Sequence, residues 1–194
     1  ASGQKWLGML GMHGTYEANL AMHGCDLMIA VGARFDDRIT GRVADFSPGS
    51  IKAQIDIDPS SINKIIHVDL PIQGDVGHVL EDMLKIWKSR GRKTNSEAVR
   101  KWWSQIEQWR EVNCLAYTNS DTIIKPQYAL ERLEALTKGR DRYITTEVGQ
   151  HQMWAAQFLH FDDPNRWMTS GGLGTMGYGL PASVGVQVAH PDAL

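Results

Sequence analysis

The sequence predicts an α/β protein built on a parallel, doubly wound sheet. Short apolar runs of strand length alternate with segments whose apolar residues have helical spacing. Two of these runs end in polar, glycine-containing turns, which are typical of ligand-binding loops in open α/β sheets. With 194 residues, of which 42% are hydrophobic and 22% charged, the chain can form one or two domains with a sizeable core.

Three strands are expected in the first half of the chain. Residues 26–35 hold a continuous apolar run that ends in Gly32, which is typical of a strand buried on both faces. Residues 51–58 alternate more clearly between apolar and polar and end before a proline. Residues 65–70 form a shorter apolar run, which we predict as the third strand.

Two helices are expected after these strands. Asp75 is a suitable N-cap for a helix that reaches Trp87, because the apolar residues between them keep helical spacing. Thr94 and Glu97 fit a capping box that opens a second helix, in which three tryptophans lie on one broad face. The tryptophans could form a binding surface, but we expect them to pack this helix against a neighbouring domain.

The last third of the chain repeats the alternation of helix and strand. Pro126 suits the first turn of a helix, and Gly139 suits the position just after its end. Residues 142–147 and 166–169 are predicted as strands. A final amphipathic helix is expected from apolar residues spaced by four, which are Leu180, Val184 and Val188.

Composition argues against several classes of function. The net charge of −2 provides no basic surface for nucleic acid. Cys25 and Cys114 have neither metal-ligand spacing nor the pattern of a disulfide framework, so we expect reduced thiols. No apolar run approaches the roughly 20 residues of a membrane-spanning helix, and the first residues lack the apolar core of a signal peptide. A cytoplasmic protein is therefore preferred, or an organellar one if the source is eukaryotic.

One candidate ligand loop follows the first predicted strand. Gly32–Arg38 contains two arginines that could neutralise a pyrophosphate and two aspartates that could orient them. Asp56, near the end of the second strand, suits a ribose hydroxyl, and His13 could lie along a flat ring. The loop could equally be a solvated, self-paired charged segment, with His13 structural and Asp75 only a helix cap.

Two further candidate loops lie in the last third of the chain. Gln150 and His151 follow a glycine between a predicted strand and helix, where side chains and backbone N–H groups can bind phosphate; Gln150 could instead merely cap the helix. The segment 171–181 has five glycines in its first nine positions, and Met176 among them could support a cofactor ring or fill the core. Glu147 could be a base, a hydrogen-bond anchor or a surface carboxylate.

Four motifs carry a resemblance to a known family. Residues 10–14, 32–41, 149–157 and 169–181 closely resemble segments of the large catalytic subunits of acetolactate synthases (acetohydroxyacid synthases), in the order found there. The likeness covers nearly the whole chain and is weakest in residues 88–124. These enzymes depend on thiamin diphosphate and also carry FAD and magnesium.

The resemblance implies a division of the chain. Residues 1–87 would be most of a Rossmann-like, FAD-binding central domain, and residues 88–124 a linker with the tryptophan-rich helix. Residues 125–194 would be the first part of the thiamin-diphosphate-binding α/β domain. We therefore expect this sequence to be a piece of a longer chain.

The resemblance also assigns site residues by matching motif positions. Contacts with thiamin diphosphate are expected from Gln150, His151, Gly174, Thr175 and Met176. The residues expected to line FAD are Leu10, Gly11, Met12, His13, Gly32, Ala33, Arg34, Phe35, Asp36, Asp37, Arg38, Asp56, Ile57, Asp75 and Val76. No metal ligand is expected among the 194 residues, because the family's Gly-Asp-Gly magnesium motif would lie beyond Leu194.

The family joins two 2-ketoacids, pyruvate with pyruvate or with 2-ketobutyrate, with loss of carbon dioxide, in the synthesis of valine, leucine and isoleucine. Its members form homodimers or larger assemblies, in some cases with a regulatory small subunit. The glutamate that activates the cofactor belongs to the family's N-terminal domain, so these residues alone are expected to be inactive. The alternatives are another thiamin-diphosphate enzyme, such as glyoxylate carboligase or a ketoacid oxidase, and a non-catalytic FAD- or nucleotide-binding module.

Overall fold

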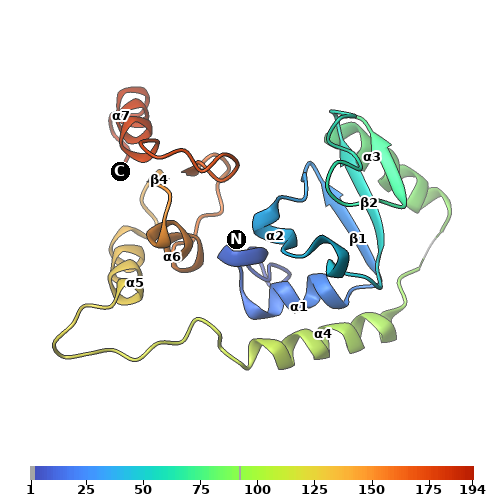
Figure 1. Ribbon diagram of the computed structural model, residues 1–194, viewed down its shortest axis with the longest axis horizontal. Coiled ribbons are helices and arrows are strands. Elements are labelled where there is room, and N and C mark those ends of the chain that lie inside the picture. The colour runs from blue at the N-terminus through green and yellow to red at the C-terminus, as the bar shows by residue number, and fades with distance from the viewer. Residues whose placement is uncertain (1–2, 92) are drawn as a thin grey trace. The chain divides into compact units, whose positions relative to one another are not determined.

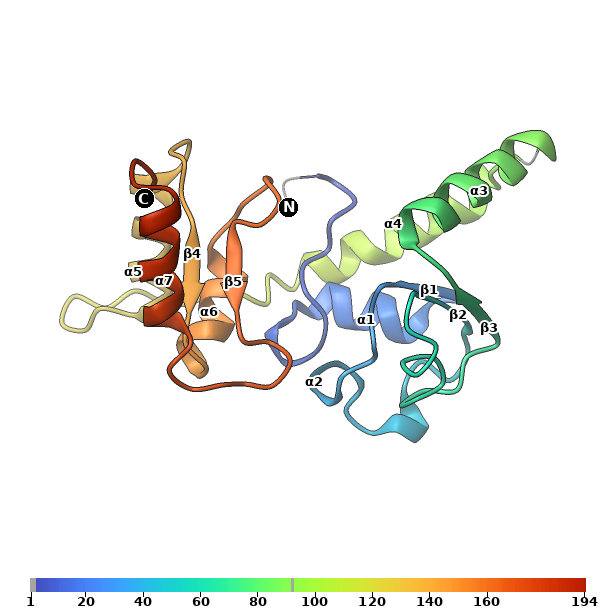
Figure 2. The same ribbon diagram turned by 90° about the horizontal axis from the view of Figure 1, so that it is seen from above.

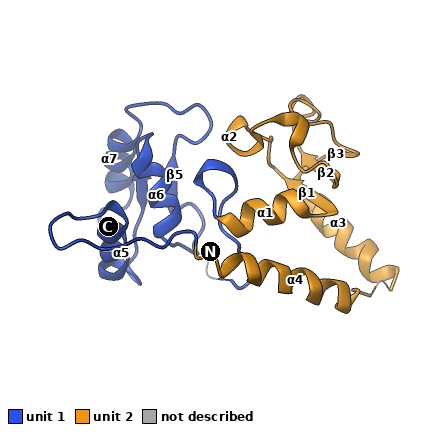
Figure 3. Cartoon of the chain, turned by 60° about the horizontal axis from the view of Figure 1, so that its bottom comes forward, with its two compact units in different colours: residues 1–15, 114–194 blue, residues 16–113 orange. Residues whose placement is uncertain are grey.

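A computed structural model describes residues 3–91 and 93–194 of the chain, so Ala1, Ser2 and Arg92 of the predicted domain and linker segments lie outside the described residues. The chain divides into two compact units (Figure 3). Tyr16–Asn113 form one, called here the three-stranded unit; Ala1–Thr15 with Cys114–Leu194 form the other, the two-stranded unit. Both are α/β with parallel strands, which confirms the predicted fold class. The domain boundaries at residues 87 and 124 stay a prediction.

The sheet of the three-stranded unit contains β1 (Leu27–Val31), β2 (Ile51–Asp56) and β3 (Leu70–Gln73), which run parallel in the order β1-β2-β3 (Figure 1). The central strand β2 is buried over four consecutive residues, and its Ile55 has no exposed surface. Such a buried run is expected for the middle strand of a parallel sheet.

The third strand was predicted in the wrong place. It begins at Leu70, whereas residues 65–69 form a bend. Ile66 and Val68 are nevertheless buried in the core. The side chain of Asn63, whose φ is +61°, accepts a hydrogen bond of 2.8 Å from the N–H of Val68, which holds the segment in a turn. The apolar pattern thus indicated burial correctly and strand conformation wrongly.

The remaining elements of this unit are helical. They are α1 (Tyr16–Gly24), α2 (Asp37–Thr40), α3 (Val76–Ser89) and α4 (Ser96–Arg110), with a 3₁₀ turn η2 (Val43–Asp45). The buried core lies beside β1 and consists of Ala30, Phe35, Phe46, Ile66 and Val68.

One of the two predicted helix caps is confirmed. The side chain of Asp75 accepts a hydrogen bond from the N–H of His78 and caps α3. The cap of α4 is Asn95 and not Thr94, because the side chain of Asn95 accepts from the N–H of Ala98 at 3.1 Å. Three neighbouring polar residues could each cap here, and the sequence pattern chose the wrong one.

The tryptophan-rich helix α4 packs against α1 of the same unit. Ile106 is buried at this contact, and the three tryptophans are half-buried. Trp102 and Trp109 meet edge to face with ring centroids 5.6 Å apart, and the Arg110 guanidinium lies over Trp103. The tryptophans therefore serve packing, as expected, although their partner is a helix within the unit.

The two-stranded unit contains η1 (Gly11–His13), α5 (Pro126–Thr137), β4 (Ile144–Thr146), α6 (Gln150–Phe158), β5 (Trp167–Thr169) and α7 (Gly179–Ala189). The strands β4 and β5 lie side by side (Figure 2) and are parallel, and the register places Thr146 opposite Thr169. Both predicted strands are confirmed, as is the placement of Pro126 in the first turn of α5. Gly139 follows that helix with φ +80°.

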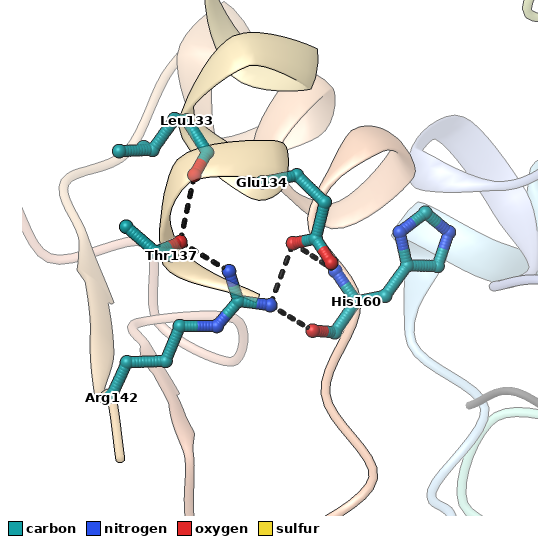
Figure 4. A network of polar contacts seen from close by, with 5 residues as sticks. All are labelled: Leu133, Glu134, Thr137, Arg142 and His160. Carbon is teal, nitrogen blue, oxygen red and sulfur yellow. Dashed lines mark hydrogen bonds and ion pairs between the residues drawn. The ribbon is translucent and has the colours of Figure 1, made fainter. Parts of the chain in front are cut away.

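Arg142 ties α5 to the segment that follows α6 (Figure 4). Its guanidinium donates to Thr137 Oγ1, to Glu134 Oε2 at 2.6 Å and to the carbonyl of His160. Glu134 also accepts from the N–H of His160 at 3.2 Å. The Arg142 and Glu134 side chains are only 11% and 16% exposed, so removal of either leaves a poorly solvated charge.

We expect Glu134→Ala to lower the free energy of unfolding by about 3 kcal/mol, because it strands the Arg142 guanidinium. Glu131→Ala in the same helix is the control; Glu131 is exposed and accepts one hydrogen bond from Tyr117. Urea unfolding of the two variants gives the comparison. Equal losses of stability would contradict a structural role for the Arg142 network.

Candidate cofactor-binding sites

In the two-stranded unit, two loops leave the same edge of the sheet. Residues 147–149 follow β4 and lead into α6, while residues 170–178 follow β5 and lead into α7. Because β4 and β5 are parallel, both loops start at the carboxyl ends of their strands. Ligands of open parallel sheets bind at this edge. The two segments predicted for thiamin diphosphate therefore begin side by side.

A buried set of hydrogen bonds supports this edge. Thr146 Oγ1 and Thr169 Oγ1, which face each other on β4 and β5, are 2.7 Å apart. Gln152 of α6 is 6% exposed, and its side-chain amide donates to Thr169 Oγ1 at 2.6 Å. These bonds fix the start of α6 against both strands.

The first loop presents two polar side chains. Gly149, the residue before α6, has φ +150°, a conformation that side chains disfavour, and Gln150 and His151 are exposed in the first turn of the helix. A Cβ atom on Gly149 would lie 3.2 Å from the His151 ring. The N-cap of α6 is Gly149 and not Gln150, so the capping alternative has no support. Exposed donors beside a helix N-terminus suit an anionic group.

The second loop is rich in glycine and is anchored at its start. The N–H of Thr175 donates to Ser170 Oγ at 2.8 Å, and the N–H of Gly174 donates to the Ser170 carbonyl at 3.2 Å. Gly174 has φ +64°, which favours glycine. Met176 is 70% exposed. It is therefore not a core filler, and its side chain is available to a ligand.

Glu147 anchors the other end of this loop. Its Oε2 accepts from the N–H of Gly177 at 2.7 Å, and its Oε1 accepts from the N–H of Gly179. Desolvation tends to raise the pKa of Glu147, but hydrogen bonds from the backbone of residues 177–180 outweigh it and hold this pKa below its ordinary value. Of the three roles left open by the sequence, the structure shows the hydrogen-bond anchor.

Gly179 begins α7 directly against the end of β4. A Cβ atom on Gly179 would lie 2.7 Å from the backbone nitrogen of Glu147 and 2.8 Å from the carbonyl carbon of Thr146. Both contacts are with backbone, which cannot move aside cheaply. Glycine is therefore required here by close approach of two backbone segments.

We expect Gly179→Ala to destabilise the protein by on the order of 1–3 kcal/mol, because it forces the start of α7 away from β4. Gly185→Ala is a matched control in the same helix, since a Cβ there meets nothing within 4 Å. It is expected to stabilise by roughly 0.5–1 kcal/mol through helix propensity. Thermal unfolding distinguishes the two, and equal effects would refute the close contact.

A second candidate edge lies in the three-stranded unit. The segments after β1, β2 and β3 all start at the carboxyl end of the sheet. The N–H of Gly32 donates to the Ile55 carbonyl at 2.9 Å, and the N–H of Gly74 donates to the Asp56 carbonyl at 3.0 Å. A Cβ on Gly32 would lie 3.8 Å from a methyl of Val76. The predicted FAD residues that follow the three strands are therefore brought together.

These residues differ in what they offer a ligand. Arg34 donates to Asp36 at 2.9 Å, while Arg38 is exposed. The Phe35 ring is buried against Phe46, so this side chain belongs to the core. Asp37 begins α2, and Ala33 and Ile57 are exposed. Asp56 accepts from the N–H of Asp58, and Asp75 caps α3, so both carboxylates already carry a local hydrogen bond.

Gln54 supports this edge and was missed by the sequence analysis. It is fully buried in β2, and its amide nitrogen donates to the carbonyls of Ala33 at 3.1 Å and Ser61 at 3.3 Å. Its Oε1 has no hydrogen-bond partner among the described residues. A polar residue within a buried strand was the available signal.

The remaining FAD candidates, Leu10 to His13, belong to the two-stranded unit. They form η1 and the residue before it. Gly14 closes this turn; a Cβ there would lie 2.3 Å from the Met9 carbonyl oxygen, and its own carbonyl accepts from the Gln157 side chain at 3.4 Å. Met12 is 47% exposed. Glycine at position 14 thus lets the turn close on itself, and η1 packs against α6.

Within the described residues, no three histidine, cysteine, aspartate or glutamate side chains gather as a group that could hold a metal ion. In the same part of the chain, no helix has both the length and the apolar character needed to cross a membrane.

Family models match two parts of the chain. Residues 2–83 match the central domain of the thiamine pyrophosphate enzymes, and residues 147–194 match their C-terminal TPP binding domain. The chain belongs to the thiamine pyrophosphate enzymes. Thiamine pyrophosphate is another name for thiamin diphosphate, so the second match covers both loops at the edge of the two-stranded unit.

Three curated relatives are similar to this chain over almost the full length of the chain. The acetolactate synthase isozyme 3 large subunit of Escherichia coli is 52% identical over 99% of this chain and 33% of its own length. The acetolactate synthase large subunit of Haemophilus influenzae is 46% identical over 97% of this chain and 33% of its own length. The acetolactate synthase large subunit of Buchnera aphidicola is 46% identical over 96% of this chain and 32% of its own length. The chain spans about a third of the length of these relatives.

Proposed function

We propose that this chain is the cofactor-binding part of an acetolactate synthase large subunit. The parent enzyme condenses pyruvate with a second pyruvate or with 2-ketobutyrate and releases carbon dioxide. The observation that carries the proposal is the meeting of residues 149–151 and 170–178 at one sheet edge. The similarity to acetolactate synthase large subunits along 95–99% of the chain supports it.

Within this proposal, the two loops divide the binding of thiamin diphosphate. Gln150 and His151 bind the diphosphate beside the N-terminus of α6. Gly174, Thr175 and the exposed Met176 contact the aminopyrimidine. When bound, thiamin diphosphate supplies a carbon nucleophile and an electron sink for decarboxylation. The residues of this chain bind and orient it.

FAD is proposed at the edge of the three-stranded unit. The exposed Arg38 and the Asp36-oriented Arg34 suit a pyrophosphate, while Asp56 and Asp75 suit hydroxyl groups. The left-handed Gly32 lets the backbone approach closely. FAD has a structural role in the family. Leu10 to His13, which the resemblance also assigns to FAD, stay a prediction.

Magnesium is also proposed for the parent enzyme. The parent is proposed to be a cytoplasmic homodimer or larger assembly, in some cases with a regulatory small subunit. The alternative functions are another thiamin-diphosphate carboligase, such as glyoxylate carboligase, and a non-catalytic FAD- or nucleotide-binding module.

Titration of the chain with thiamin diphosphate, followed by tryptophan fluorescence, tests the proposed site, because Trp154 lies in α6 beside it. We expect saturable quenching and weaker binding of thiamin, which lacks the diphosphate. His151→Ala should weaken thiamin diphosphate binding by about tenfold through loss of one hydrogen bond to an anion. His67→Ala, an exposed histidine of the three-stranded unit, is the control.

Two outcomes would count against the proposal. Equal affinity for thiamin and thiamin diphosphate would exclude a diphosphate site at Gln150 and His151. Binding of FAD without any binding of thiamin diphosphate would favour the non-catalytic module.

A further inference from the structure

We infer that Glu147 is the positioning residue that holds the glycine-rich loop 171–178 in a single conformation before any ligand binds. It does so through its two hydrogen bonds to the backbone N–H groups of Gly177 and Gly179. That this conformation favours the binding of thiamin diphosphate rests on the proposed function; the anchoring itself does not.

The loop is tied to two residues outside it. Ser170 accepts from the N–H groups of Gly174 and Thr175 in the middle of the loop, and Glu147 accepts from the N–H groups of Gly177 and Gly179 at its end. Two of the anchored residues, Gly174 and Gly177, have φ of +64° and +80°. Glycine backbone has many alternative conformations, so without anchors this segment has a high conformational entropy.

The position of Glu147 links the two loops. It is the first residue after β4 and stands two residues before Gly149, so its backbone belongs to the loop that leads to Gln150 and His151. Its side chain holds the other loop, and its backbone nitrogen lies against Gly179. A displacement of Glu147 would therefore move both halves of the candidate site together.

The arrangement requires an ionised carboxylate of this length. Its two oxygens each accept from a separate N–H group, whereas a glutamine offers one oxygen and one NH₂ group. In Glu147→Gln, the NH₂ group would face a backbone donor and one N–H group would lose its partner. Glu147→Asp keeps two acceptors but is shorter by one methylene, so it should restore part of the anchoring.

Backbone hydrogen exchange of the 194-residue chain, measured by mass spectrometry, tests the anchoring. In Glu147→Gln we expect exchange of residues 171–179 to be about tenfold faster, in line with loss of one charge-assisted hydrogen bond. Exchange in α5 and β1–β3 should be unchanged. Glu147→Asp should lie between the wild type and Glu147→Gln. Glu81→Gln, an exposed glutamate in α3, is the control and should leave exchange of the loop unchanged.

Unchanged exchange of the loop in Glu147→Gln would overturn the inference, and so would acceleration that is uniform over residues 114–194, since that reports general destabilisation. A parallel titration with thiamin diphosphate separates the two proposals. We expect the dissociation constant to rise about tenfold in Glu147→Gln through lost pre-organisation. If the loop loosens but the wild type binds no thiamin diphosphate, the anchoring stands and the proposed function fails.

Discussion

Parallel pairing of short strands is the constraint on which both candidate sites depend. Because β4 runs parallel to β5, and β1 and β3 run parallel to β2, every strand of each sheet ends at the same edge. The segments that leave those ends are distant in sequence but start only one or two strand spacings from one another. As a result, glycine-containing turns that are separate in the sequence lie together at one edge of the sheet in each compact unit.

The two edges are supported in different ways. In the two-stranded unit, polar side chains hold the loops: Thr146, Thr169 and Gln152 fix the strands and α6, and Glu147 holds the glycine-rich loop. In the three-stranded unit, backbone hydrogen bonds between the ends of neighbouring strands hold the loops, and Gln54 donates to the Ala33 carbonyl in the first loop. In both units, the groups that could bind a ligand remain exposed, because other groups hold the loops in place.

Much of the fold follows from sequence pattern alone. The alternation of apolar runs and helical segments predicted the α/β class, and Asp75 and Pro126 marked helix starts because their local chemistry acts within a single turn. Ile66 and Val68 misled the strand prediction, because an apolar run indicates burial as well as strand conformation. The hydrogen bond from the N–H of Val68 to the Asn63 side chain holds this segment in a turn. Thr94 misled the cap prediction because neighbouring Asn95 offers an equivalent acceptor.

The support of the sites was harder to predict, because it depends on contacts across long sequence separations. Gly179 was recognised as a glycine in a loop, but its close approach to the backbone of Glu147 appears only once α7 lies against β4. The same contact gives Glu147 its role, which the sequence left open. The supporting role of Gln54 depends on its hydrogen bond to the Ala33 carbonyl, which the sequence alone does not show.

We propose that each of the two sheet edges binds its own cofactor. The most direct test is amide chemical-shift mapping of the ¹⁵N-labelled chain during separate titrations with thiamin diphosphate and FAD. Thiamin diphosphate should shift the amides of residues 149–151 and 171–179, and FAD those of residues 32–38, 56–57 and 75–76. Shifts that appear at the opposite edge, or that are spread evenly over the chain, would contradict the account.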